Sequence, residues 1–260
     1  MRNIIILSGV LISILTSCIG SGDLFYSSLN KGSEIAKSEG QLDHSKWDQL
    51  LMAHVNEKGF VDYDGFQKDR SKLKDYLEYL NQNVPQKDWG LNQQFAFYIN
   101  LYNAATVEVI LENKQPESIK DIGSTVNPVW IQDFIKVGGK DYSLADIEKG
   151  VLQEMGDPRI HFAINCASYS CPKLMNNAYT AATVDEMMDQ AAKEFINSDK
   201  NDLSNPDNPK LSKIFKWYSS DFESTGMSII EYINQYADSQ INQGASLDYK
   251  DYDWSLNKQD

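Results

Sequence analysis

The stretch from Asn92 to Glu112 constrains the fold of this chain more than any other part of its sequence. Residues 95–111 read FAFYINLYNAATVEVIL, and at helical spacing their apolar side chains cover nearly every face. We therefore predict a long helix buried at the centre of the domain. Asn100 and Asn103 share one face of this helix. A buried amide without partners costs about 1–3 kcal/mol, so we expect each to bond either loop backbone or the groups of a functional site.

Amphipathic periodicity predicts further helices, and alternation of apolar and polar residues predicts short strands. The expected helices cover residues 47–55, 64–80, 143–150, 184–196 and 228–237. The expected extended segments cover residues 59–63, 129–137, 140–143, 159–165, 211–218 and 252–256, with a hairpin turn at Gly138 and Gly139. Because helices dominate, we predict an α+β fold: a helix-rich single domain over residues 42–260 with a small, mainly antiparallel sheet.

The N-terminus is typical of an exported protein. Arg2 precedes an apolar run from Ile4 to Leu15, which is shorter than the roughly 20 residues that a membrane span needs. The following Leu-Thr-Ser-Cys sequence resembles the lipobox of bacterial lipoproteins and makes Cys18 the expected lipidation site. We predict a signal peptide over residues 1–17, a flexible tether over residues 18–41 and a place in the bacterial cell envelope, facing the periplasm or the exterior. The alternative is an ordinary cleaved signal with an incidental cysteine.

The charge of the chain argues against several classes of partner. Acidic residues number 37 against 24 Lys and Arg, which gives a formal net charge of −13. No basic patch stands out to neutralise phosphates, so a nucleic-acid partner is not expected. An acidic surface also does not adsorb to an anionic membrane, which leaves the lipid on Cys18 as the expected membrane contact. We expect no cofactor and no metal ion, because the acidic loop at residues 199–207 lacks the Gly and Glu of a calcium-binding loop.

Several segments, in order, resemble the domain of unknown function 547 family. They are FYINLYNA (97–104), SIKDI (118–122), VGGKDYSLADIEKG (137–150), DPRIHFAINCASYSCPKL (157–174), IFKWYSSDF (214–222) and DYDWSLN (251–257). The resemblance spans residues 42–257 and implies no activity. One departure from the family pattern is Lys149, which follows Glu148 where many members have His.

The residues best suited to catalysis are His161, Cys166 and Cys171. A thiolate is a good nucleophile, and a neighbouring imidazole can keep it ionised and protonate a leaving group. Papain-like and transglutaminase-like enzymes use such a pair with a third polar group that orients the ring; here Asn103, Asn100 and Glu148 are the candidates. The leading hypothesis is a cell-envelope cysteine hydrolase or acyl transferase, of papain- or transglutaminase-like fold, that acts on an envelope peptide or amide.

The same residues allow other readings. Cys166 and Cys171 can form a disulfide that staples their loop, which would leave a non-catalytic binding or scaffold module. On a regular strand, His161 and Cys166 would also point to opposite faces. A zinc site would use the two cysteines and His161, although their spacing is wider than is usual.

Aromatic residues provide a further candidate surface. Trp130, Trp217, Tyr218 and Trp254 could pave a cleft for a carbohydrate or a peptide, although aromatic side chains more often belong to the core.

Overall fold

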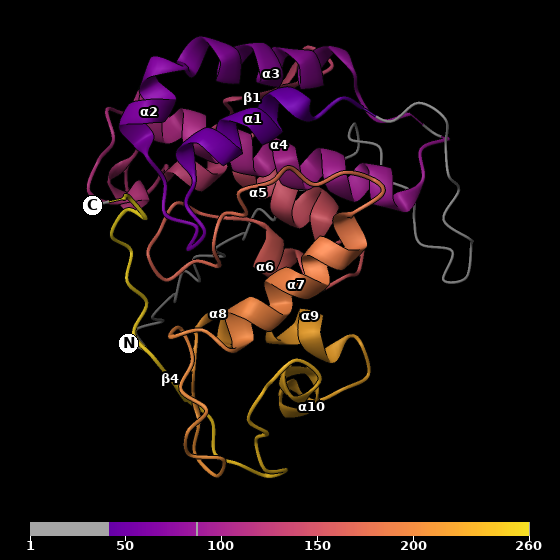
Figure 1. Cartoon of the computed structure of the whole chain (residues 1–260), viewed down its shortest axis with the longest axis vertical. Helices are drawn as coiled ribbons and strands as arrows, with labels where there is room; N and C mark the ends of the chain where they lie inside the picture. The colour runs from indigo at the N-terminus through magenta and orange to yellow at the C-terminus, as the bar shows by residue number, and fades with distance from the viewer. Residues whose placement is uncertain (1–41, 87, 260) are drawn as a thin grey trace, which may run out of the picture.

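Helix α4 (Leu91–Glu112) is the central element of the fold, as its apolar sequence predicts. The computed structural model describes residues 42–86 and 88–259, so the predicted signal peptide, Cys18 and the tether lie outside the described residues. Nearly every side chain of α4 is buried, Asn100 and Asn103 included. Figure 1 shows α3 (Arg70–Gln82) and α1 (Ser45–His54) above α4, with the short α2 (Tyr63–Lys68) at one end. Among the described residues, no helix is long and apolar enough to cross a membrane.

Two small sheets accompany the helices, which confirms the predicted α+β class. Strands β1 (Ile135–Val137) and β2 (Lys140–Tyr142) form the antiparallel hairpin predicted at Gly138 and Gly139, both of which have a positive φ. The predicted strand 129–137 is too long, since Val129–Ile131 is a 3₁₀ turn. The hairpin stays short because β2 ends where Ser143 caps the next helix, α5 (Leu144–Ile147), in a capping box with Asp146.

Helix α5 continues into a π-helical turn over Glu148–Leu152. The Gln153 N–H donates to the Glu148 carbonyl at 2.9 Å, the i to i+5 bond that defines such a turn. The predicted helix from Ser143 to about Gly150 is therefore present, with a wider final turn that begins at Glu148.

Two predicted strands are wrong. Residues 159–165 contain the helical turn α6 (Ile160–Ala163), and residues 214–217 form α8 (Ile214–Trp217) instead of the end of a strand. The first begins after Asp157 and Pro158, which are typical helix-starting residues; the Asp157 carboxylate accepts the Arg159 N–H at 3.0 Å. In the second, Ile214 and Phe215 are buried whereas Lys216 and Trp217 are exposed, so the helical turn buries one side.

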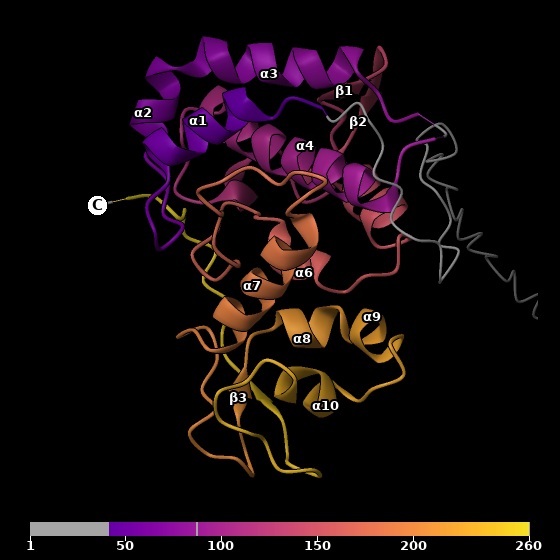
Figure 2. The same cartoon turned by 45° about the vertical axis from the view of Figure 1, so that its right-hand side comes forward.

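The C-terminal half forms a second layer beneath α4. Figure 2 shows α6 and α7 (Val184–Ile196) between α4 and the lower helices α8, α9 (Ser219–Glu223) and α10 (Ile229–Asn234). Strands β3 (Lys210–Leu211) and β4 (Asp248–Tyr249) pair in parallel near the lower end. The C-terminal segment then returns to the upper layer, where the Val61 N–H donates to the Asn257 carbonyl at 2.9 Å.

Asn100 and Asn103 of α4 each bond backbone as both donor and acceptor. Asn100 donates to the Tyr179 carbonyl at 2.7 Å and accepts the N–H of the same residue at 3.1 Å. Asn103 donates to the Ala163 carbonyl at 3.0 Å and accepts the Asn165 N–H at 2.8 Å. Each side-chain amide thus satisfies one carbonyl and one N–H of a segment that packs on α4. We call the two hydrogen bonds of Asn103 the Asn103 clamp; they hold the segment that leads into Cys166.

We predict that Asn103→Ala lowers the free energy of unfolding by roughly 2–4 kcal/mol, because it leaves the Ala163 carbonyl and the Asn165 N–H buried without that partner. Urea denaturation followed by circular dichroism measures this change. As a control, Glu112→Ala removes an exposed pairing with Arg70 (3.3 Å) at the end of the same helix, and its effect should stay below about 1 kcal/mol. Equal losses in the two variants would contradict the clamp.

Candidate functional site

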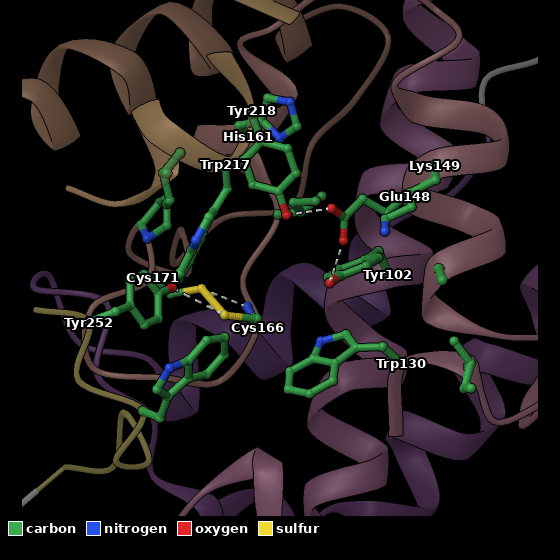
Figure 3. A pocket seen from close by; sticks show the side chains of 16 residues that line it. Tyr102, Trp130, Glu148, Lys149, His161, Cys166, Cys171, Trp217, Tyr218 and Tyr252 are labelled. Atoms are coloured by element: carbon green, nitrogen blue, oxygen red, sulfur yellow. Dashed lines mark hydrogen bonds between the residues drawn. A yellow bond between two sulfur atoms is a disulfide. The ribbon is translucent and has the colours of Figure 1, made fainter. Parts of the chain in front are cut away.

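A cavity of about 250 Å³ lies between the upper and lower layers and collects most of the predicted site residues. His161, Cys166, Cys171 and Glu148 line it, whereas Asn100 and Asn103 do not. The remaining walls are largely aromatic and apolar: Tyr102, Trp130, Ile131, Ile164, Ile214, Trp217, Tyr218, Tyr252 and Trp254. These residues come from α4, the turns after it, α8 and the C-terminal segment, so only the folded chain assembles the cavity (Figure 3).

The aromatic walls form a connected cluster. Trp217 and Trp254 are stacked with ring centroids 5.9 Å apart, and Tyr252 lies against both, at 4.8 and 4.6 Å. Trp130 meets Trp254 edge-on at 5.6 Å. Trp217 is 46% exposed and Ile131 is 50% exposed, which is unusual for large apolar side chains. The cluster therefore presents apolar surface at a hollow, the arrangement typical of ligand sites.

Glu148 supplies the buried carboxylate of the cavity. Its side chain is held by two tyrosines, the Tyr218 hydroxyl donating at 2.7 Å and the Tyr102 hydroxyl at 3.2 Å (Figure 3). Burial and the neighbouring carboxylate raise the pKa of both tyrosines well above the usual value, so both remain donors. Within residues 42–86 and 88–259, no Lys, Arg or His forms an ion pair with Glu148. The following residue, Lys149, is exposed and lies at the wall of the same cavity.

His161 is buried, with 3% of its surface exposed, and its partner is Asp221 on α9. The distance from Nε2 to the Asp221 carboxylate is 2.7 Å, and because a carboxylate accepts, Nε2 carries the proton. This bond lowers the pKa of Asp221 below its ordinary value. The other ring nitrogen, Nδ1, is buried and has no hydrogen-bond partner among the described residues. The Tyr218 ring stacks on the imidazole at 3.8 Å between centroids.

Cys166 and Cys171 form a disulfide, with their Cα atoms 6.2 Å apart. The bridge closes the loop after α6, and it faces the cavity next to Tyr252, whose hydroxyl lies 3.5 Å from Cys166 Sγ (Figure 3). Asn165 secures the same loop by donating to the Pro172 carbonyl at 2.7 Å and accepting the Ala167 N–H at 2.8 Å. In this redox state no thiol is available at either position, and the loop is a fixed wall of the cavity.

The predicted residues thus fall into two groups. The cavity brings together His161, Cys166, Cys171 and Glu148, while Asn100 and Asn103 bond backbone beneath it. No hydrogen bond links His161 to either sulfur in the described part of the chain; its orienting partner is Asp221, which the sequence analysis missed. The expectation that a strand places His161 and Cys166 on opposite faces is wrong, because His161 lies on α6 and Cys166 follows it in a loop.

Tyr102 and Tyr252 were also missed as site residues. Tyr102 lies within the apolar helix at 92–112, one residue before Asn103, so its pattern indicates only burial. Tyr252 comes from the C-terminal segment and reaches the cavity only through the chain's return to the upper layer; burial raises its pKa to about 12. Asp221 lies in the segment IFKWYSSDF, where nothing in the spacing connects it with His161.

The described residues offer no arrangement for a metal ion. Among them, no group of three or more His, Cys, Asp or Glu side chains is placed to hold one. The zinc alternative built on His161, Cys166 and Cys171 is therefore wrong for this state, since the two sulfurs bond each other.

Comparison with known proteins connects this site to one family. Residues 86–196 match the model of a family described as "Protein of unknown function, DUF547". No curated protein and no solved structure matches the chain. The matched residues run from the start of α4 to the end of α7 and include Glu148, His161 and both cysteines of the disulfide, but not the segments that carry Asp221 and Tyr252. Over this stretch, then, the chain is similar to the DUF547 family, whose description states no activity.

Proposed function

We propose that this protein is a lipid-anchored protein of the bacterial cell envelope whose domain binds an envelope peptide or a cell-wall-derived fragment in the aromatic cavity. The observation that carries the binding proposal is the cluster of Trp130, Trp217, Tyr252 and Trp254, partly exposed, around the buried carboxylate of Glu148. Aromatic faces bind the apolar faces of sugars and peptide side chains, and a few convergent polar groups orient such ligands.

The stapled loop supports a binding role. A cavity whose walls are already fixed loses little conformational entropy when a ligand enters. The disulfide and the Asn165 hydrogen bonds fix the loop that forms one wall, and the Asn103 clamp fixes its start. The contacts around the cavity are therefore those of a preformed site.

The anchoring proposal rests on the Leu-Thr-Ser-Cys sequence that ends in Cys18. We expect cells that express the protein to incorporate an alkyne-labelled palmitate into it, and Cys18→Ser to abolish the label. The double variant Cys166→Ser, Cys171→Ser is the control and should retain the label. Label that persists in Cys18→Ser would exclude this anchor.

For the binding proposal, we expect muropeptides from a lysozyme digest of peptidoglycan to bind the protein, with saturation-transfer NMR and calorimetry as measurements. Trp217→Ala should weaken binding by about tenfold or more, because the loss of one stacked ring in a ligand site costs about 1–3 kcal/mol by analogy with measured aromatic stacking. Tyr169→Ala removes an aromatic side chain that is 38% exposed and does not line this cavity, and should leave affinity unchanged. Similar losses in both variants, or no binding at all, would count against the site.

A second candidate is thiol-dependent hydrolysis, and one observation favours it. The Asp221 carboxylate orients the His161 imidazole through Nε2, which leaves the lone pair of Nδ1 unbonded, as a general base requires. Two equivalents of an external thiol would first reduce the disulfide and form their own disulfide. His161 would then take the proton of the Cys166 thiol at Nδ1, and the thiolate would attack the amide carbonyl. The imidazolium would give that proton to the leaving amine, and water would hydrolyse the thioester.

This candidate predicts that muropeptide hydrolysis appears only after reduction with dithiothreitol and is lost in Cys166→Ser. Cys171→Ser, which removes the bridge and keeps the nucleophile, should be active without reductant. Mass spectrometry after alkylation of the natively exported protein reports the redox state of both sulfurs. If both sulfurs alkylate only after reduction and the reduced protein still does not hydrolyse muropeptides, the thiol-dependent candidate is excluded and the binding role remains.

A further inference from the structure

The environment of the Glu148 carboxylate is electrostatically incomplete. A carboxylate that is 6% exposed has lost most of its hydration, and such a charge is normally compensated by a cation. Glu148 has only the two tyrosine hydroxyls as partners, and no cationic side chain of the described residues pairs with it. Two donors for two oxygens leave further lone pairs unused.

Two other carboxylates of the described chain, Glu108 and Asp157, differ in this respect. The Glu108 carboxylate, with 12% of its side chain exposed, is paired with Arg70 at 2.6 Å. Asp157 is paired with Arg159, also at 2.6 Å. At these two positions the fold supplies an arginine, whereas Glu148 has no ion pair among the described residues and faces a cavity whose wall includes the exposed Lys149.

The aromatic walls around this carboxylate also favour a positively charged ligand. The faces of Trp and Tyr carry the negative end of the ring quadrupole and attract cations, most strongly where water is excluded. The cluster already engages one cation in this way, since Lys120 Nζ lies 5.2 Å from the centroid of Trp254. Aromatic rings with an acidic group at one side are the arrangement by which proteins recognise ammonium groups.

We propose that the cavity recognises an organic ammonium group, with Glu148 as its counter-ion and the rings of Trp217, Trp254 and Tyr252 around its alkyl substituents. This inference rests on the proposed binding function and specifies the class of ligand. A primary amine on a peptide side chain and a quaternary ammonium headgroup share this chemistry. The acidic net charge of the chain, −13, also favours the approach of a cation.

The test compares cations with neutral compounds of the same shape. Choline is matched with 3,3-dimethylbutan-1-ol, and Nα-acetyllysine methylamide with Nα-acetylnorleucine methylamide. Dissociation constants for the full chain are measured by NMR titration. We expect at least one of the two cations to bind about tenfold or more tightly than its neutral partner, and the pair that shows this preference identifies the source as quaternary headgroup or side-chain amine.

Glu148→Gln preserves shape and an acceptor for the tyrosines while removing the charge. It should reduce the preference for the cation to within about twofold and leave the neutral partner's affinity unchanged. Glu154→Gln, an exposed position beyond the π-helical turn, is the matched control and should change neither affinity. Should Glu148→Gln not fold, the comparison of matched ligands on the native chain still decides.

Equal affinity for the cation and the neutral partner in both pairs, or no measurable binding of either cation, would overturn the inference. If muropeptides still bind in a Trp217-dependent manner in that case, the binding function stands and only the ligand class is wrong. If muropeptides also fail to bind, both proposals fall.

Discussion

The hydrogen bonds of Asn103 join the two layers of this protein, and the cavity between them depends on that connection. Asn103 lies in the middle of the largely apolar α4, and its amide satisfies the Ala163 carbonyl and the Asn165 N–H. Asn165 in turn bonds the loop that contains the disulfide. The buried amides of Asn103 and Asn165 therefore fix one wall of the cavity relative to the central helix. Buried polar networks of this kind tolerate little displacement, because each unpaired group is costly.

The opposite wall obtains its polarity from the π-helical turn. The wider turn begins at Glu148, whose carboxylate lies among the aromatic walls (Figure 3). Tyr102 from α4 and Tyr218 from the lower layer both donate to it, so the carboxylate also bridges the layers. Irregular helical turns of this type are frequent at functional sites, where they redirect a side chain. Here the redirected side chain is an acid that the fold leaves without a cationic partner among its described residues.

The redox state of the Cys166–Cys171 pair determines whether the cavity can only bind a ligand or also offers a thiol for catalysis. With the disulfide formed, the loop is a rigid wall and the cavity can only bind. With the disulfide reduced, a thiol would share the cavity with the oriented imidazole of His161, although the Tyr218 ring covers one face of that imidazole. The proposed export would place the chain in an oxidising or mixed compartment, which favours the disulfide and with it the binding chemistry. The His161 Nδ1 is buried and has no hydrogen-bond partner among the residues that the structure describes, a feature that a purely structural histidine does not need.

The sequence by itself determined the local and strongly periodic elements. The apolar run of α4, the glycine pair of the hairpin and the cap at Ser143 are each encoded within a few neighbouring residues, and all were predicted. Local cues also existed for α6, where the helix-starting Asp157 and Pro158 outweigh the strand propensity that misled the prediction. Only the tertiary structure decided the site. Asp221 reaches His161 across 60 residues, and Tyr102 and Tyr218 meet at Glu148 from different layers. Such contacts depend on how the layers pack, and this packing cannot be predicted from the spacing of residues along the chain.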